Sequence, residues 1–311
     1  LSHGYARNWI ILCSLLPKTF RWFWLWQETP RSPNFSAWSV LGSIVLMLAT
    51  QGVNIIINIF FGVTLNAALG IAQQVNSAVN QFLGNFQTAF NPPLTKSYAL
   101  NGLDGKTFDF VCDTSRMTFL LVMVIGFPIV LNIDGLLNIW LVKVPEYAVE
   151  FSTLFILYTV LDGCSGPLYI LVYANGKIRG YQILLSTIQI IYVILVYVLC
   201  VSGMSPVAIL SLNVVNGVLL FAGRLIVLRH MMQFPVMTYL KQVFSSALYP
   251  LSLFFICGIF IEKGLSDTVG MVLVIRLALS GVVALVALYF LYLNNRERQF
   301  IIKTIQSRIG R

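Results

Sequence analysis

GIAQQVNSAVNQFLGNFQTAFNPPL, residues 70–94, has the length of a membrane-spanning helix and carries no charged residue. It nevertheless contains eight side-chain amides. An unsatisfied polar group is costly in hydrocarbon, so these amides cannot face lipid. They must face other helices or water, and this choice decides what kind of membrane protein the chain forms.

The composition of the whole chain excludes an ordinary soluble domain. Hydrophobic residues make up 58% of the 311 residues and charged residues 10%, where a soluble domain carries about 25% charged residues. The mean hydropathy is +0.84. In such a chain the net charge of +9 indicates an excess of Lys and Arg in the loops on one side of the membrane. We therefore predict no nucleic-acid partner. The five cysteines have neither metal-ligand nor redox spacing, so we predict no metal site and no cofactor.

Hydrophobic runs of roughly 20 residues, the length that a membrane crossing requires, divide the chain into spans. Placing the connections alternately on two sides puts 17 of the 20 Lys and Arg residues on the cytoplasmic side, which is the positive-inside pattern. We therefore predict an all-α integral membrane protein with both termini in the cytoplasm. The eight expected transmembrane helices are 38–61, 67–93, 117–140, 149–173, 181–202, 206–228, 244–262 and 269–293.

The amides of the opening stretch follow the helical period. On a helical wheel six of the eight share an arc of roughly 140 degrees, Gln74 and Asn85 lie at its boundary, and the opposite side is apolar. The preceding span repeats this pattern on one of its faces. The residues of these two polar faces that we predict to line a cargo pathway are Gln51, Asn54, Asn58, Gln73, Asn76, Ser77, Asn80, Gln81, Gln87 and Asn91.

Two interpretations of these polar faces remain. They could hold helices together by interhelical hydrogen bonds, or they could border a water-filled cavity. The length of the pattern favours the cavity, because packing uses polar groups sparingly at about 0.6 kcal/mol each. Neutral amides and hydroxyls suit a hydroxyl-rich cargo such as sugar, whereas an inorganic ion needs a tight cage of carbonyls or carboxylates.

Among the charged residues inside the expected spans, Asp162 and Arg276 are the two candidates for a functional role. Asp162 lies near the middle of its span, and Gly163, Gly166 and Pro167 after it would loosen the helix there. It is a candidate coupling residue, with local pairing to a hydroxyl or backbone amide as the alternative. Arg276 could reach the headgroups, contact an anionic cargo or pair with an acid such as Asp162. No nucleophile–base arrangement is present, so we predict no catalytic residues and no enzyme.

Several stretches resemble the polysaccharide and O-antigen flippases of bacteria, which belong to the multidrug/oligosaccharidyl-lipid/polysaccharide exporter superfamily. They are GVTLNAALGIAQQVNSAV (62–79), NPPLTKSYA (91–99), LNIWL (137–141) and SGPLYILVYANGKIRGYQ (165–182). The resemblance implies that residues 38–242 form the second six-helix lobe of such a transporter and 243–293 an additional helix pair. Residues 1–37 would be a basic cytoplasmic or interfacial remnant of a truncation, and 294–311 a basic cytoplasmic tail. The first lobe is then expected as a missing partner.

The resemblance also implies a function. We expect a multi-pass flippase of the bacterial inner membrane that moves lipid-linked oligosaccharide by alternating access, with a proton or Na⁺ as candidate coupling ion. The alternative is a cation-coupled multidrug exporter of the same superfamily, which would need an acid in its cavity. A membrane-embedded transferase or ligase would require catalytic groups facing a sizeable outer loop, and the expected outer loops are short.

Overall fold

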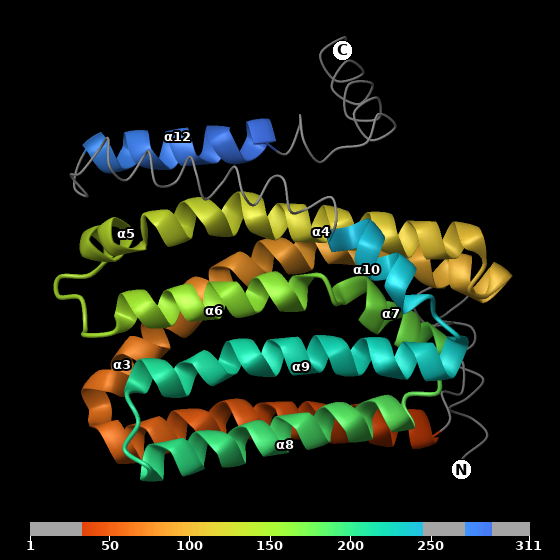
Figure 1. Ribbon diagram of the computed structural model, residues 1–311, viewed down its shortest axis with the longest axis horizontal. Coiled ribbons are helices and arrows are strands. Elements are labelled where there is room, and N and C mark those ends of the chain that lie inside the picture. Colours follow the sequence, from red (N-terminus) through yellow and green to blue (C-terminus); the bar gives the residue numbers. More distant parts are fainter. Residues whose placement is uncertain (1–32, 245–270, 288–311) are drawn as a thin grey trace, which may run out of the picture.

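The computed structural model describes residues 33–244 and 271–287, and every regular element in these two ranges is a helix (Figure 1). The predicted all-α class is thereby confirmed for this part of the chain. Outside it lie residues 1–32 of the expected segment 1–37, residues 245–262 of the expected span 244–262, both ends of the expected span 269–293, and the tail 294–311. The helices are α3 (Pro33–Asn101), α4 (Gly105–Leu131), α5 (Ile133–Trp140), α6 (Ala148–Gly163), α7 (Gly166–Asn175), α8 (Arg179–Val201), α9 (Pro206–Met232), α10 (Val236–Phe244) and α12 (Met271–Ala287).

Four of these helices, α3, α4, α8 and α9, are long and apolar enough to cross a membrane. The pair α6 and α7 qualifies as a fifth when it is counted as one span bent by 44°. The described residues thus have the helices of a membrane-spanning protein. The number of eight spans and their orientation stay predictions.

Helix α3 is divided at Gly62, where the backbone has φ +79° and ψ −177°. Glycine adopts this conformation without the steric cost that a Cβ would bring. The chain reverses direction there, so the two halves of α3 run in opposite directions along the bundle (Figure 1). We call residues 33–61 arm 1 and residues 63–101 arm 2. They correspond to the first two expected spans, 38–61 and 67–93.

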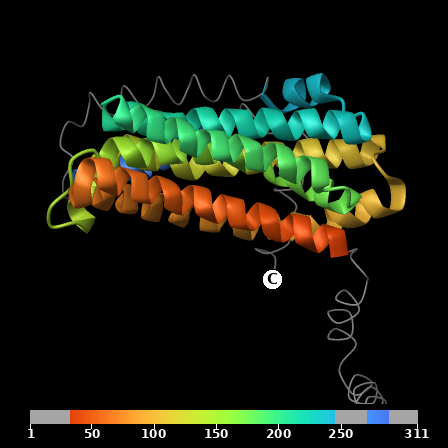
Figure 2. The ribbon, with the colours of Figure 1, turned by 90° about the horizontal axis from the view of Figure 1, so that it is seen from below.

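The connections between the long helices alternate between the two ends of the bundle. Segments 102–104, 176–178 and 233–235 lie at one end, and the turn at Gly62 and the segment 202–205 lie at the other (Figure 1). Figure 2 shows the same helices from below, aligned along one direction. This arrangement is the one that alternating membrane spans require.

Two apolar clusters fill the two ends of the bundle, and polar groups lie between them. One cluster contains Ile57, Leu69 and Phe151, and the other contains Leu171 and Tyr239. On arm 2, on α6 with α7 and on α9, the chain passes from one cluster to the other. The residues between the clusters form the middle layer, and they are 76–91, 158–166 and 213–224. This layer contains the candidate site.

Candidate functional site

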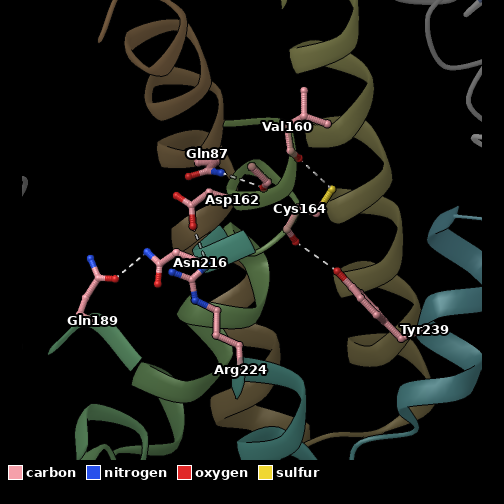
Figure 3. A network of polar contacts seen from close by, with 9 residues as sticks. Gln87, Val160, Asp162, Cys164, Gln189, Asn216, Arg224 and Tyr239 are labelled. Carbon is pink, nitrogen blue, oxygen red and sulfur yellow. Dashed lines mark hydrogen bonds and ion pairs between the residues drawn. The ribbon is translucent and has the colours of Figure 1, made fainter. Parts of the chain in front are cut away.

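The site is built around the break between α6 and α7. Pro167 has no N–H, so the carbonyl of Gly163 lacks its usual helical donor four residues later. Gln87 on arm 2 supplies a replacement, with its Nε2 3.3 Å from that carbonyl oxygen (Figure 3). Tyr239 on α10 donates its hydroxyl to the next carbonyl, that of Cys164, at 3.1 Å. Both carbonyls are satisfied by side chains of other helices, which makes a broken helix tolerable inside a membrane.

An ion pair lies directly at this break. Asp162, in the last turn of α6, accepts a hydrogen bond from Nη1 of Arg224 on α9 at 2.7 Å (Figure 3). The Arg224 side chain is 15% exposed and that of Asp162 is 38% exposed. The two opposite charges compensate each other, so the centre of the site has no net charge.

Two cavities meet at the ion pair. The arm 1 cavity, of about 270 Å³, lies between arm 1, α8 and the broken helix. The arm 2 cavity, of about 180 Å³, lies between arm 2 and the same break. Asp162, Tyr169 and Arg224 contribute to the walls of both cavities, so these three residues form the partition between them.

The walls of both cavities are rich in hydroxyls and amides. Among the described residues that line them, Asp162 and Arg224 alone are charged. The polar neutral residues of the arm 1 cavity are Ser43, Tyr158, Tyr169, Tyr173, Tyr181, Gln182, Ser186 and Gln189. Those of the arm 2 cavity are Asn80, Gln87, Ser165 and Tyr169.

Half of the predicted pathway residues hold helices together. Gln73 donates its amide to Oδ1 of Asn54 at 2.9 Å and thereby joins the two arms. Thr159 of α6 donates its hydroxyl to the side chain of Asn76 and accepts a bond from Asn80 at 3.3 Å. With Gln87, these residues form the inner half of the predicted stripe, and their role is interhelical hydrogen bonding.

The outer half of the stripe is exposed. Gln51 and Asn58 lie on the exposed side of arm 1, and Ser77 and Gln81 on that of arm 2. Asn91 is intermediate, with its Oδ1 buried and without a hydrogen-bond partner in the described part of the chain. Interhelical hydrogen bonding thus accounts for the inner half of these residues, and a water-filled cavity along the outer half stays a prediction.

The exposed face of arm 2 differs from that of a lipid-facing helix. Between residues 64 and 89 its one large hydrophobic residue is Phe82, and the others are small or carry an uncharged polar group. They are Thr64, Ala67, Gly70, Gln74, Ser77, Ala78, Gln81, Gly84, Asn85, Thr88 and Ala89. On α8 the exposed residues of the last three turns are instead Ile190, Ile191, Ile194, Leu195, Tyr197, Val198 and Val201.

Arg224, the partner of Asp162, was missed by the sequence analysis. The loop-charge pattern counted it on the cytoplasmic side although the expected span 206–228 contains it, and in the structure it lies within α9. A signal existed, because Asn213 and Asn216 share its face of the helix. Asn216 is buried and donates to Gln189 of α8 at 2.8 Å.

Arg276 occupies a different part of the molecule. It lies on α12, which packs against α4, and it is 4% exposed. The ion pair that the structure gives Asp162 is with Arg224 and not with Arg276.

No protein-family model, no curated protein and no solved structure matches this chain.

Proposed function

We propose that this protein is a flippase, which moves the neutral, hydroxyl-rich headgroup of a lipid-linked oligosaccharide across the bacterial inner membrane by alternating access. One observation carries the proposal: between residues 64 and 89 the exposed face of arm 2 has no charged residue, and apart from Phe82 its residues are small or polar. The sequence resemblance to polysaccharide flippases points to the same cargo.

The exposed amides need hydrogen-bond partners that lipid does not provide. A side-chain amide has two donors and one acceptor oxygen, and none of them finds a partner in lipid. Exposed Gln74, Gln81 and Asn85 would be stabilised by water or by sugar hydroxyls, which both donate and accept hydrogen bonds. A headgroup could move along such a face from one amide to the next while its lipid tail stays in the bilayer.

The charge of the cavities separates the flippase from a cation exporter. A cationic drug needs an acid that no internal cation already neutralises. Asp162 is neutralised by Arg224, and the described lining of the two cavities contains no other acid. A neutral cargo therefore fits the site better than a cation does.

The test is translocation of a polyprenyl-linked neutral oligosaccharide in vesicles that contain the protein, detected with a glycosidase added outside. Replacing Gln81 and Asn85 together by leucine should slow translocation strongly, because the face would become apolar. The matched control replaces Ile190 and Ile194 of the apolar α8 face by leucine and should leave the rate unchanged. Wild-type translocation by the Gln81 and Asn85 variant would contradict the proposal.

Dye efflux distinguishes the exporter. If the protein extrudes a cationic dye, and Asp162→Asn abolishes this extrusion while oligosaccharide translocation is absent from the wild type, the exporter replaces the flippase.

A further inference from the structure

We propose that the arm 1 cavity is a saccharide-binding subsite, in which a sugar ring packs against Tyr169 and is hydrogen bonded by Gln189. The inference rests on the proposed function, because the ring would belong to the transported headgroup. It goes beyond that function by giving the cargo a defined resting place inside the bundle, on the side of the ion pair away from arm 2.

Tyrosine rings form one part of the wall of the arm 1 cavity. Tyr169 is 43% exposed and lines both cavities, so its ring is accessible from either side of the ion pair. Tyr173 supports it from a centroid distance of 4.3 Å and itself contacts Tyr181 at 6.4 Å. A held aromatic ring offers a large apolar face with a polar hydroxyl at its edge. The C–H face of a pyranose ring and its outer hydroxyls match this combination.

Two side-chain amides in the wall of the same cavity are positioned by their neighbours. Asn216 donates to Oε1 of Gln189 at 2.8 Å, so the acceptor of Gln189 is occupied and its Nε2 remains as a donor for the cavity. The amide of Gln182 lies against Gly42, where a Cβ would overlap it. A glycine at position 42 therefore leaves room for a second amide in the cavity wall.

The charge and the size of the arm 1 cavity both suit a neutral sugar. Asp162 uses Oδ1 for Arg224, which leaves its other carboxylate oxygen to accept a bond from a hydroxyl. The charged groups of the lining sum to zero, so the cavity favours a neutral ligand. Its volume of about 270 Å³ is just below the range for drug-sized ligands, roughly 300–1,000 Å³, which suits one or two sugar rings.

The experiment measures saccharide binding to the full chain in lipid nanodiscs, which contain no sugar detergent. The probe is a neutral hexose tetrasaccharide, and a uronic acid tetrasaccharide of equal length tests the charge argument. Saturable binding of the neutral probe is expected, with weaker binding of the acidic one. Tyr169→Leu and Gln189→Leu should each weaken binding by about tenfold, whereas Tyr169→Phe should retain most of it. Tyr197→Leu, on the exposed face of α8, is the control and should bind like the wild type.

A second measurement does not depend on the stability of these variants. A cysteine at Ser43, in the wall of the arm 1 cavity, should be modified by a water-soluble thiol reagent more slowly when the neutral tetrasaccharide is saturating. No saturable binding, unprotected Ser43→Cys, or wild-type affinity in both leucine variants would overturn the subsite.

Translocation measurements separate the subsite from the proposed function. If translocation depends on Gln81 and Asn85 but is unchanged by Tyr169→Leu, the subsite is wrong and the flippase stands. If the tetrasaccharide binds as expected but no lipid-linked oligosaccharide is moved, the subsite stands and the flippase is wrong.

Discussion

Gln87 donates its side-chain amide to the backbone carbonyl of Gly163, a residue 76 positions later in the sequence. That carbonyl has no helical donor because Pro167 follows it by four residues. One amide of arm 2 therefore holds the broken helix in place, next to the ion pair of Asp162 and Arg224. A movement of arm 2 would change the hydrogen bonding at the break, and this contact connects the exposed polar face with the centre of the bundle.

Replacing Gln87 by leucine should destabilise the protein. The carbonyl of Gly163 would be left without a partner in a largely apolar environment, and we expect a loss of about 1 kcal/mol in the free energy of unfolding. Gln81→Leu is the control, because Gln81 is exposed. Thermal unfolding in nanodiscs measures both, and equal melting temperatures for the two variants would argue against the role of Gln87 at the break.

Gly166→Ala should also act through Gln87. A Cβ at position 166 would overlap the amide group of Gln87 and displace it from the Gly163 carbonyl. We expect lower stability for the single variant and little further loss when Gln87→Ala is already present, because the two changes remove the same contact. Gly180→Ala has open space around its Cβ and should be neutral or slightly stabilising. Additive effects of the Gly166 and Gln87 changes would show that they are independent.

The ion pair should show strong energetic coupling. Asp162→Asn leaves Arg224 unpaired, and Arg224→Gln leaves Asp162 unpaired. Each change should lower the free energy of unfolding by about 1–2 kcal/mol. This is less than the roughly 3–5 kcal/mol lost when one partner of a fully buried pair is removed, because the Asp162 side chain is 38% exposed. The double variant should recover most of the loss. A double-mutant cycle in thermal or denaturant unfolding measures this, and a coupling near zero would contradict a stabilising contact.

Outside the membrane spans, Asp104 should make the start of α4 sensitive to acid. Its carboxylate accepts a bond from the backbone N–H of Thr107 at 2.7 Å, and this bond lowers the pKa of Asp104 below its ordinary value of 3.8. Its stabilising contribution is therefore present above that value and is lost as the pH falls through the lowered pKa. Asp104→Asn should keep the helix cap and remove this acid sensitivity, whereas Asp104→Ala should lose the cap at every pH. Hydrogen exchange of the amides at 105–108 reports the outcome, and identical pH profiles in wild type and Asp104→Asn would refute it.

The sequence predicts the helices well where their signal is local. Six of the expected spans correspond to helices: the two arms of α3, α4 together with α5, α6 together with α7, α8, and α9. A run of roughly 20 apolar residues is long enough to cross a membrane, and as a helix it satisfies its own backbone hydrogen bonds there. The loosening expected after Asp162 coincides with the break, because Gly163, Gly166 and Pro167 are each poor helix residues.

The partners of polar groups are less accessible to sequence analysis. The helical period places Asn76, Asn80 and Gln81 on one face, but it does not show that α6 covers only one side of that face. The partner of Arg224 was equally hidden. Asp162 lies 62 positions away in the sequence, so no local pattern joins the two residues. Tertiary packing decides which polar residues bond with each other and which stay exposed.

The central claim is that the exposed face of arm 2 borders water. In a protein whose five native cysteines have been replaced, single cysteines are placed at Ser77 and Gln81 and, as lipid-facing controls, at Ile190 and Ile194. The protein is reconstituted in vesicles and treated with a charged, water-soluble thiol reagent. We predict rapid modification at positions 77 and 81 and none at 190 and 194. Cysteines at 77 and 81 that are as unreactive as those at 190 and 194 would contradict the aqueous passage and with it the proposed transport.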